Sequence, residues 1–394
     1  MPPAARPPLF TPLFVMLALA NLASTMVFYL LMATMATHAA AAFGASPAEA
    51  GLVSSIFLIG GLFGRPLAGF VLGAYGLRRV LVWSTLAYLL TSAGYLLVPS
   101  LVGTLAVRFA HGIAFGVSAS AALGSVMSLV PAARQGEGAG WAGAGVAVAT
   151  GLGPFLGFAL LNGPAGMAGV FAAVLGFALV AAALALTASR SLPPQPRRSG
   201  RGRPAIIERP ALPIGLVVAL TAIAFGSILT FLNTYTLGTS LAPAASGYFV
   251  VYASVLLVAR PFAGVVQDRH GDDVVLVPAL VAVSAGVVTT ALAEHGVVLL
   301  LGAAFLGVGY GTLISAGQAF AIARVPRGHA GIAVASFFLV VDAGTGIGPA
   351  LLGTLVPAVG FRGVFLAGAG LSVAALGFYL LAARRTPRVS AVTP

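Results

Sequence analysis

The sequence predicts an all-α polytopic membrane protein with twelve transmembrane helices in two pseudo-symmetric six-helix halves. The first supporting observation is composition: of 394 residues, 59% are hydrophobic and 7% are charged, whereas soluble chains carry about 25% charged residues. The second is a series of long apolar runs, each sufficient to cross roughly 30 Å of hydrocarbon as a helix. The third is an internal repeat.

The internal repeat joins two stretches that lie 195 residues apart. Residues 64–82 read GRPLAGFVLGAYGLRRVLV and residues 259–277 read ARPFAGVVQDRHGDDVVLV, with nine of nineteen positions identical. The same offset places Pro131 on Pro326. An offset that holds across separate segments identifies a duplicated unit. We therefore expect an N-terminal six-helix half at 1–189, a cytoplasmic linker at 190–210 and a C-terminal six-helix half at 211–394.

Short breaks that carry Pro and Gly separate the apolar runs, as turn chemistry predicts. Ser46-Pro47, Gly163-Pro164 and Pro357 are examples. We expect spans at residues 10–36, 47–73, 79–98, 102–130, 135–161, 166–188, 211–238, 244–268, 274–294, 297–323, 329–356 and 361–383.

The basic residues are all arginines and gather on one side of this topology. Because cytoplasmic loops carry an excess of basic residues, we expect both termini to be cytoplasmic and the protein to lie in a bacterial inner membrane. Arg362 alone falls on the other side. The net charge of +12 then reflects orientation, and no nucleic-acid partner is expected. The arginines on the expected cytoplasmic side are Arg6, Arg78, Arg79, Arg134, those of 190–209, Arg269, Arg324, Arg327, Arg384, Arg385 and Arg388.

The linker around residues 191–210, SLPPQPRRSGRGRPAIIERP, is rich in Pro, Arg and Ser and lacks hydrophobic periodicity. This composition is typical of a flexible tether. An alternative is a patch that attracts anionic lipids, since each surface Arg contributes about 1 kcal/mol.

The repeated stretch carries a recognisable glycine and charge pattern. In the second half Gly264, Asp268, Arg269 and Gly271 have the spacing Gly, three residues, Asp-Arg, one residue, Gly. This pattern resembles the loop motif of the major facilitator superfamily, and the resemblance extends over essentially the whole chain. The first half keeps Gly69, Gly76, Arg78 and Arg79, with Gly73-Ala74 in place of Asp-Arg.

Two further segments resemble motifs of the same superfamily. Arg108-x-x-His111-Gly112 is similar to its fourth-span Arg-x-x-Gln-Gly. Gly153-Pro154-x-x-Gly157 is similar to the fifth-span motif associated with antiporters, although it recurs as Gly348-Pro349, as repeat symmetry alone would produce.

The resemblance implies a secondary transporter in which the two halves rock about a central site. Among its members the chain is similar to bacterial sugar- or drug-efflux permeases, which favours proton-coupled efflux of a small organic molecule. The alternatives are a proton symporter or facilitator for uptake, or a transport-inactive membrane sensor. The expected partners are a small-molecule substrate, protons and the lipid bilayer, and we expect a monomer.

Enzyme activity is not expected from this sequence. Cysteine is absent, which excludes disulfides, thiolate metal sites and cysteine nucleophiles. No nucleotide-binding, zinc-protease or serine-hydrolase pattern is present. We therefore expect no catalytic residues, no metal and no cofactor.

Asp342 is the one acidic residue well inside a predicted span. A carboxylate there costs about 2.5–3.5 kcal/mol unless it is paired or neutralised. Asp342 is therefore a candidate for proton coupling, with Arg108 or His111 across the cavity as partners. The alternative is a hydrogen bond from Asp342 to a neighbouring helix.

Polar and aromatic stripes identify candidate cavity residues. Arg108, His111, Phe115 and Ser118 fall on one helical face, and a charged face should avoid lipid. The alternative for each residue is an ordinary contact between helices. The cavity or substrate candidates are Asn21, Thr25, Phe28, Phe115, Ser118, Asn233, Tyr235, Ser315 and Gln318.

The repeated stretch also supplies gate candidates. Arg65 and Arg260 lie near the expected cytoplasmic ends of their spans, where they would either reach towards lipid headgroups or hold the halves together. Repeat symmetry places Asp268 near Arg134, at the start of the fifth span. The gating motif consists of Arg65, Gly69, Gly76, Arg78, Arg260, Gly264, Asp268, Arg269 and Gly271.

Overall fold

The computed structural model describes residues 9–131, 135–192, 207–326 and 329–387. Within them the chain forms twelve long helices and short 3-10 turns at Arg209–Ala211 and Ala383–Arg385. The first six are α1 (Pro12–Phe43), α2 (Pro47–Tyr75), α3 (Leu77–Gly94), α4 (Leu101–Leu129), α5 (Gln135–Leu161) and α6 (Gly166–Ser191). The second six are α7 (Leu212–Thr236), α8 (Ala242–His270), α9 (Asp273–Ala291), α10 (Gly296–Ile322), α11 (Ala330–Gly353) and α12 (Val356–Leu381).

Local sequence signals set the helix boundaries. Ser46 and Glu49 form a capping box at the start of α2, with each side chain accepting a hydrogen bond from the backbone N–H of the other residue. Helices α2 and α8 end at the equivalent glycines Gly76 (φ 80°, ψ 158°) and Gly271 (φ 92°, ψ 175°). Such a backbone is essentially restricted to glycine, so the turn itself requires both motif glycines.

The helices agree with the expected membrane-spanning architecture. In the described part of the chain, eleven helices are long and apolar enough to cross a membrane. Helix α3 is the other long helix, and Arg78 and Arg79 in its first turn lower its mean hydropathy. Helix α1 continues to Phe43, seven residues past the predicted end, because the alanine-rich segment before Phe43 favours helix.

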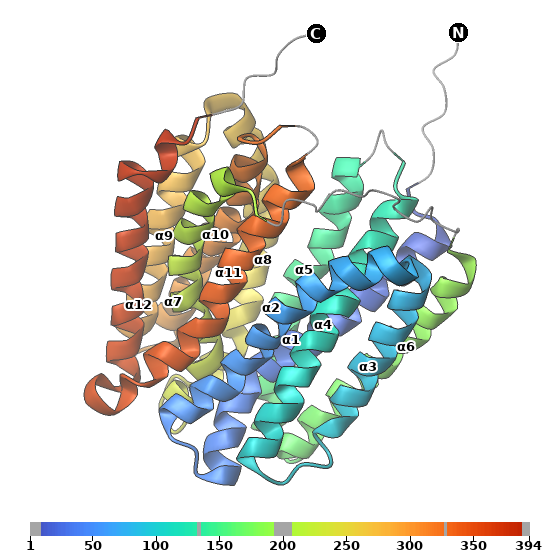
Figure 1. Ribbon diagram of the computed structural model, residues 1–394. Helices are drawn as coiled ribbons and strands as arrows, with labels where there is room; N and C mark the ends of the chain where they lie inside the picture. The colour runs from blue at the N-terminus through green and yellow to red at the C-terminus, as the bar shows by residue number, and fades with distance from the viewer. Residues whose placement is uncertain (1–8, 132–134, 193–206, 327–328, 388–394) are drawn as a thin grey trace.

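The helices form two bundles. Helices α1–α6, the N-terminal bundle, pack chiefly with one another, as do α7–α12, the C-terminal bundle. The bundles meet mainly through α2 with α11, α5 with α8 and α1 with α7. The end of the molecule where most arginines lie is called the basic end here. Figure 1 shows that the bundles cross closely at the opposite end and diverge towards the basic end.

Candidate functional site

An ion pair between Arg65 and Asp342 joins the bundles near the middle of α11. The Arg65 Nη2 lies 2.6 Å from the Asp342 Oδ2. Asp342 occupies the middle of α11, twelve residues after Ala330 and eleven before Gly353. The Asp342 side chain is 18% exposed and that of Arg65 is 43% exposed. The carboxylate is therefore largely enclosed, and its pairing offsets the cost of placing a charge at this depth.

Tyrosine hydroxyls surround this ion pair. Tyr29 of α1 and Tyr310 of α10 lie within electrostatic range of the Asp342 carboxylate. Tyr252 of α8 lies within electrostatic range of both tyrosines and of Arg260. The charged pair is thus set among hydroxyl groups from both bundles.

Aromatic side chains stack in both bundles, and some of their positions repeat with the 195-residue offset. In the N-terminal bundle, Phe115 stacks on Phe28 with ring centroids 5.5 Å apart. In the C-terminal bundle, Tyr310 stacks on Phe225 with ring centroids 4.3 Å apart. Each bundle therefore contributes one aromatic surface. The equivalent aromatic positions are Phe57 with Tyr252 and Phe115 with Tyr310.

The charges, in contrast, do not follow the repeat completely. Arg65 is matched by Arg260, but the position equivalent to Asp342 is Ala147. A single acid therefore makes this nearly symmetric scaffold functionally asymmetric. The 195-residue offset would also have identified Phe57, Tyr252 and Tyr310, which our sequence analysis did not select.

Hydrogen bonds join the bundles at the end opposite the basic end. The Thr37 and Thr234 hydroxyl oxygens lie 2.9 Å apart. The Asn162 amide donates to the Asn233 carbonyl oxygen at 3.0 Å. The Ala350 backbone N–H donates to the Ser55 hydroxyl at 3.0 Å. These contacts close the opposite end, and Asn233, predicted to line the cavity, takes part in the closure.

Small residues bring α2 and α11 together at the same end. A methyl group added to Gly51 would overlap the Pro349 carbonyl, and one added to Gly353 would lie 2.7 Å from the Pro47 carbonyl. Only glycine therefore permits this backbone approach without displacement.

The structure corrects the expected orientation of Arg108. Its side chain is 1% exposed, and it points at the backbone of α2 instead of an open cavity. The Arg108 Nε donates to the Val53 carbonyl, and Nη2 donates to the Ser54 carbonyl at 3.3 Å. Helical periodicity identified the face correctly as non-lipid but could not show which neighbour covers it.

His111 is likewise enclosed within the N-terminal bundle. Its Nε2 lies 3.0 Å from the Ser92 hydroxyl and its Nδ1 lies 3.0 Å from the Tyr95 hydroxyl. Both ring nitrogens are therefore engaged between α4 and α3. The partner of Asp342 is Arg65, not the expected Arg108 or His111.

The remaining cavity candidates differ in how far their polar groups are already used. Asn21 and Gln318 are half-buried, and their side-chain amides form no hydrogen bond with the described residues. Phe28 and Phe115 belong to the aromatic surface of the N-terminal bundle. The hydroxyls engaged within one bundle are Thr25 with the Asn21 carbonyl, Ser118 with Thr85, Tyr235 with the Ala291 carbonyl and Ser315 with the Thr312 carbonyl.

In the C-terminal copy of the predicted gating motif, the acid that pairs with other residues is Asp272. Asp268 is exposed, and its expected neighbour Arg134 lies outside the described residues. Asp272 is buried, accepts from the Gln267 amide at 2.9 Å and lies 3.1 Å from Arg324 Nη2. The sequence signal that we missed is the first acid of the His-Gly-Asp-Asp run, Asp272, which directly precedes α9. Of the other motif residues, Gly69 and Gly264 have open space around the α-carbon, and Arg78 and Arg269 are exposed.

The chain is thus a polytopic membrane protein built of two six-helix bundles, which are joined through α2 and α11 and by a charged pair. The chain belongs to the Major Facilitator Superfamily, whose family model matches residues 17–256 and, separately, residues 214–393. Membrane transport is the class of function that this family supports. In the part of the chain that the structure describes, no group of three or more acidic or histidine side chains is arranged to hold a metal.

Related proteins and solved structures agree with this assignment. An uncharacterised MFS-type transporter of Burkholderia pseudomallei is 28% identical over 88% of this chain and 86% of its own length. One of Pseudomonas aeruginosa is 28% identical over 86% and 85%. A bacterial homologue of the human lysosomal transporter Spinster, inward-facing and unoccupied, has a TM-score of 0.79 at 15% identity over 97% of this chain and 98% of that chain. The nucleoside transporter NupG has a TM-score of 0.73 at 15% identity over 96% and 100%.

Proposed function

We propose that this protein is a secondary active transporter that works by alternating access and exports a small organic molecule in exchange for protons. The supporting observation is the Arg65–Asp342 ion pair, a carboxylate at mid-membrane paired across the two bundles. Intramembrane acids are the usual proton carriers of transporters. Asp342 is the proton-binding group in this proposal, and Arg65 is its partner.

Electrostatics links the proton to the movement of the bundles. While Asp342 is ionised, it attracts Arg65 and holds α11 to α2. Protonation neutralises the carboxylate and removes this attraction, so the bundles separate more readily. Proton binding and bundle position are therefore coupled, and each must influence the other.

The substrate class follows from the surfaces near the pair. Each bundle offers stacked aromatic rings, and Asn21 and Gln318 offer unused amides. This combination suits an amphipathic molecule that carries an aromatic ring. Transporters of similar fold include those of nucleosides and peptides, which are also small organic molecules.

The basic end is cytoplasmic in this proposal, because positively charged loops remain inside. The described conformation, closed at the opposite end, is then open to the cytoplasm. Single cysteines can test the orientation, since the chain has none of its own. In intact cells Arg362→Cys should react with an impermeant thiol reagent and Arg385→Cys should not. The reverse pattern contradicts the orientation.

Transport in sealed vesicles tests the function. Aromatic cations, nucleosides and dipeptides are first screened for thermal stabilisation of the purified protein, and a stabilising compound is then loaded. A proton gradient should accelerate its exchange against protons. Movement in the same direction as protons would indicate symport, gradient-independent equilibration a facilitator, and binding without flux a sensor.

The variant Asp342→Asn tests the coupling residue. We expect it to bind the compound and to equilibrate it, but to lose accumulation against a gradient. Glu294→Gln, which neutralises an exposed acid, is the matched control and should accumulate normally. Wild-type accumulation by Asp342→Asn would rule out Asp342 as the coupling site.

A further inference from the structure

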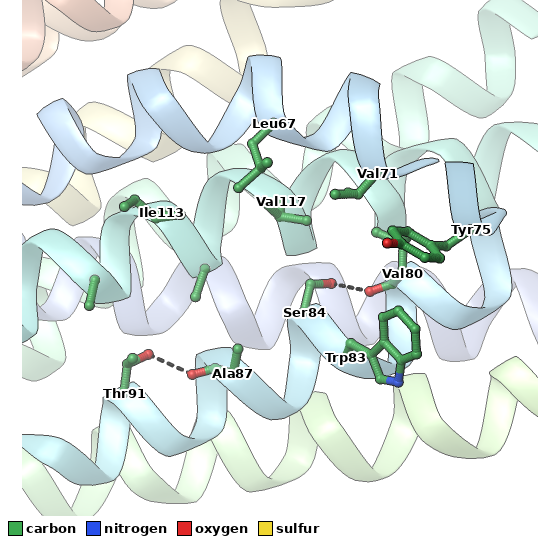
Figure 2. Close-up of a pocket in the computed structure, with 12 residues that line it drawn as sticks. Leu67, Val71, Tyr75, Val80, Trp83, Ser84, Ala87, Thr91, Ile113 and Val117 are labelled. Atoms are coloured by element: carbon green, nitrogen blue, oxygen red, sulfur yellow. Dashed lines mark hydrogen bonds between the residues drawn. The ribbon is translucent and has the colours of Figure 1, made fainter. Parts of the chain in front are cut away.

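An apolar groove of about 320 Å³ runs among α2, α3 and α4, separate from the ion pair. Helices α2 and α3 both pack along α4 but touch each other little, which leaves the groove between them. Figure 2 shows its walls, with Leu67, Val71 and Tyr75 on one side and Val80, Trp83 and Ala87 on the other.

The two aliphatic hydroxyls of the groove are bonded to the backbone of their own helix. The Ser84 hydroxyl donates to the Val80 carbonyl at 2.6 Å, and the Thr91 hydroxyl donates to the Ala87 carbonyl at 2.8 Å (Figure 2). The walls therefore present hydrocarbon and aromatic surface, which suits an alkyl chain.

The length of the groove corresponds to one leaflet of a membrane. From Val80 to Thr91 the α3 wall spans about 16 Å at ~1.5 Å per residue. Half of a hydrocarbon core of ~30 Å is ~15 Å. An acyl chain of a phospholipid fits this length.

Charge and aromatic residues mark one mouth of the groove. The Tyr75 and Trp83 rings meet edge to face there, with centroids 5.5 Å apart. Arg78 and Arg79 follow at the start of α3, and both are exposed and form no ion pair or hydrogen bond with any described residue. Aromatic side chains settle at the headgroup level of a bilayer, and arginine recognises phosphate.

At the equivalent position the C-terminal bundle carries acidic residues instead of arginines. The 195-residue offset matches Leu77 and Arg78 with Asp272 and Asp273. Asp272 pairs with Arg324, and Asp273 accepts from the Tyr379 hydroxyl at 2.6 Å. Both acids of this turn therefore have partners within the C-terminal bundle, whereas the exposed arginines of the N-terminal turn have none among the described residues.

We propose that the groove binds an anionic phospholipid, with an acyl chain between α2 and α3 and the phosphate on Arg78 and Arg79. The groove has the length of one leaflet, its charged mouth at Arg78 and Arg79 places the headgroup, and the two cations select an anionic one.

Trp83 offers a direct measurement of this lipid. The chain has two tryptophans, so Trp141→Phe leaves Trp83 as the sole tryptophan, which is excited selectively at long wavelength. This protein is reconstituted with phosphatidylglycerol or phosphatidylcholine whose acyl chains are brominated and quench tryptophan on contact. We expect phosphatidylglycerol to quench Trp83 at a lower mole fraction than phosphatidylcholine does.

Substitutions then distinguish the contribution of the lipid headgroup to binding from that of the acyl chain. Because each surface arginine contributes roughly fivefold, Arg78→Gln with Arg79→Gln should reduce the preference for phosphatidylglycerol by about 25-fold. Arg384→Gln with Arg385→Gln, an exposed pair elsewhere at the basic end, should leave it unchanged. Ala87→Phe, which fills the groove, should weaken quenching by both lipids.

Several results would contradict the proposed lipid site. Equal quenching by both lipids, or an unchanged preference after loss of Arg78 and Arg79, would show that these arginines do not bind the headgroup. Unchanged quenching in Ala87→Phe would show that no acyl chain occupies the groove. A dimer mass in native mass spectrometry, with Trp83 shielded from both brominated lipids, would show that a second copy of the chain covers the groove.

Discussion

Arg65 and Asp342 meet across the boundary between the bundles, and neither is well placed without the other. Asp342 lies at mid-membrane, where an unpaired carboxylate is costly. Arg65 is more exposed, so solvent screens part of its attraction. The pair is consequently strong enough to favour one arrangement and weak enough to be released.

Two substitutions at Arg65 distinguish the effect of its positive charge from the effect of its shape. Arg65→Gln leaves Asp342 without its partner and should destabilise the described arrangement by about 1–2 kcal/mol, a value below that of a fully buried pair because Arg65 is accessible. Arg65→Lys keeps the charge and should recover part of the loss. Thermal unfolding in detergent and accumulation in vesicles report both effects. Equal behaviour of the Gln and Lys variants would show that the charge of Arg65 has no role.

His111 should behave as a structural residue. His111→Leu removes the ring contacts of the Ser92 and Tyr95 hydroxyls. Ser92 keeps its bond to the Tyr88 carbonyl, so the expected cost of about 1–3 kcal/mol arises mainly at Tyr95. His111→Gln can still bond to one of them and should lose less. Both variants should keep the wild-type pH dependence of transport. A shifted pH profile in His111→Gln, with normal stability, would restore His111 as a coupling candidate.

Sequence reasoning identified the members of the charged pair but not the pairing. Asp342 was found by its depth in a predicted span, and Arg65 by the repeat. Their contact depends on how two separate bundles are rotated and docked, which no local pattern encodes. Arg108 shows the same limit, because periodicity places it on a protected face and only tertiary packing selects the α2 backbone as its partner.

At the scale of helices, α2 and α11 form the main joint between the bundles. The joint relies on Gly51 and Gly353, where backbones approach too closely for a side chain. Pro349 lies within α11 at this contact and has no N–H to donate along the helix. A helix so interrupted bends more readily than a regular one. The repeat identified Pro349 as the counterpart of Pro154, but Gly51 and Gly353 and their role in closing one end became evident only from the structure.

A larger side chain in the α2–α11 contact should open the end of the molecule opposite the basic end. Gly51→Val introduces a side chain where the Pro349 carbonyl lies, so the closed arrangement of this end loses stability while the alternative state does not. We expect a population shift towards opening at that end, measured by spin-label distances between α1 and α7. Gly176→Val on α6, which has open space around it, is the control. Identical distance distributions in the two variants would show that Gly51 does not limit closure.

At the scale of the molecule, the contacts between bundles lie on one side of the ion pair. Polar bonds and glycine contacts fill the region from mid-membrane to the opposite end, and the bundles diverge towards the basic end (Figure 1). Two buried clusters lie within the N-terminal bundle, and a third, centred on α7–α12, continues across the boundary onto α1, α2 and α5. Two bundles whose shared contacts gather towards one end can rock about that contact.

A disulfide across the closed end tests whether this rocking is required. The Thr37 and Thr234 hydroxyl oxygens are 2.9 Å apart on α1 and α7, so cysteines at both positions should bridge under mild oxidation, in a chain that has no other cysteine. The bridge fixes the closed end, and transport should stop when it forms and resume after reduction. Thr85→Cys with Ser118→Cys is the matched control, because these oxygens are 3.4 Å apart within the N-terminal bundle. That bridge ties α3 to α4, which move together, and should leave transport intact. Continued transport through the oxidised Thr37–Thr234 pair, with the bridge confirmed by mass spectrometry, would show that the two bundles do not need to separate at this end.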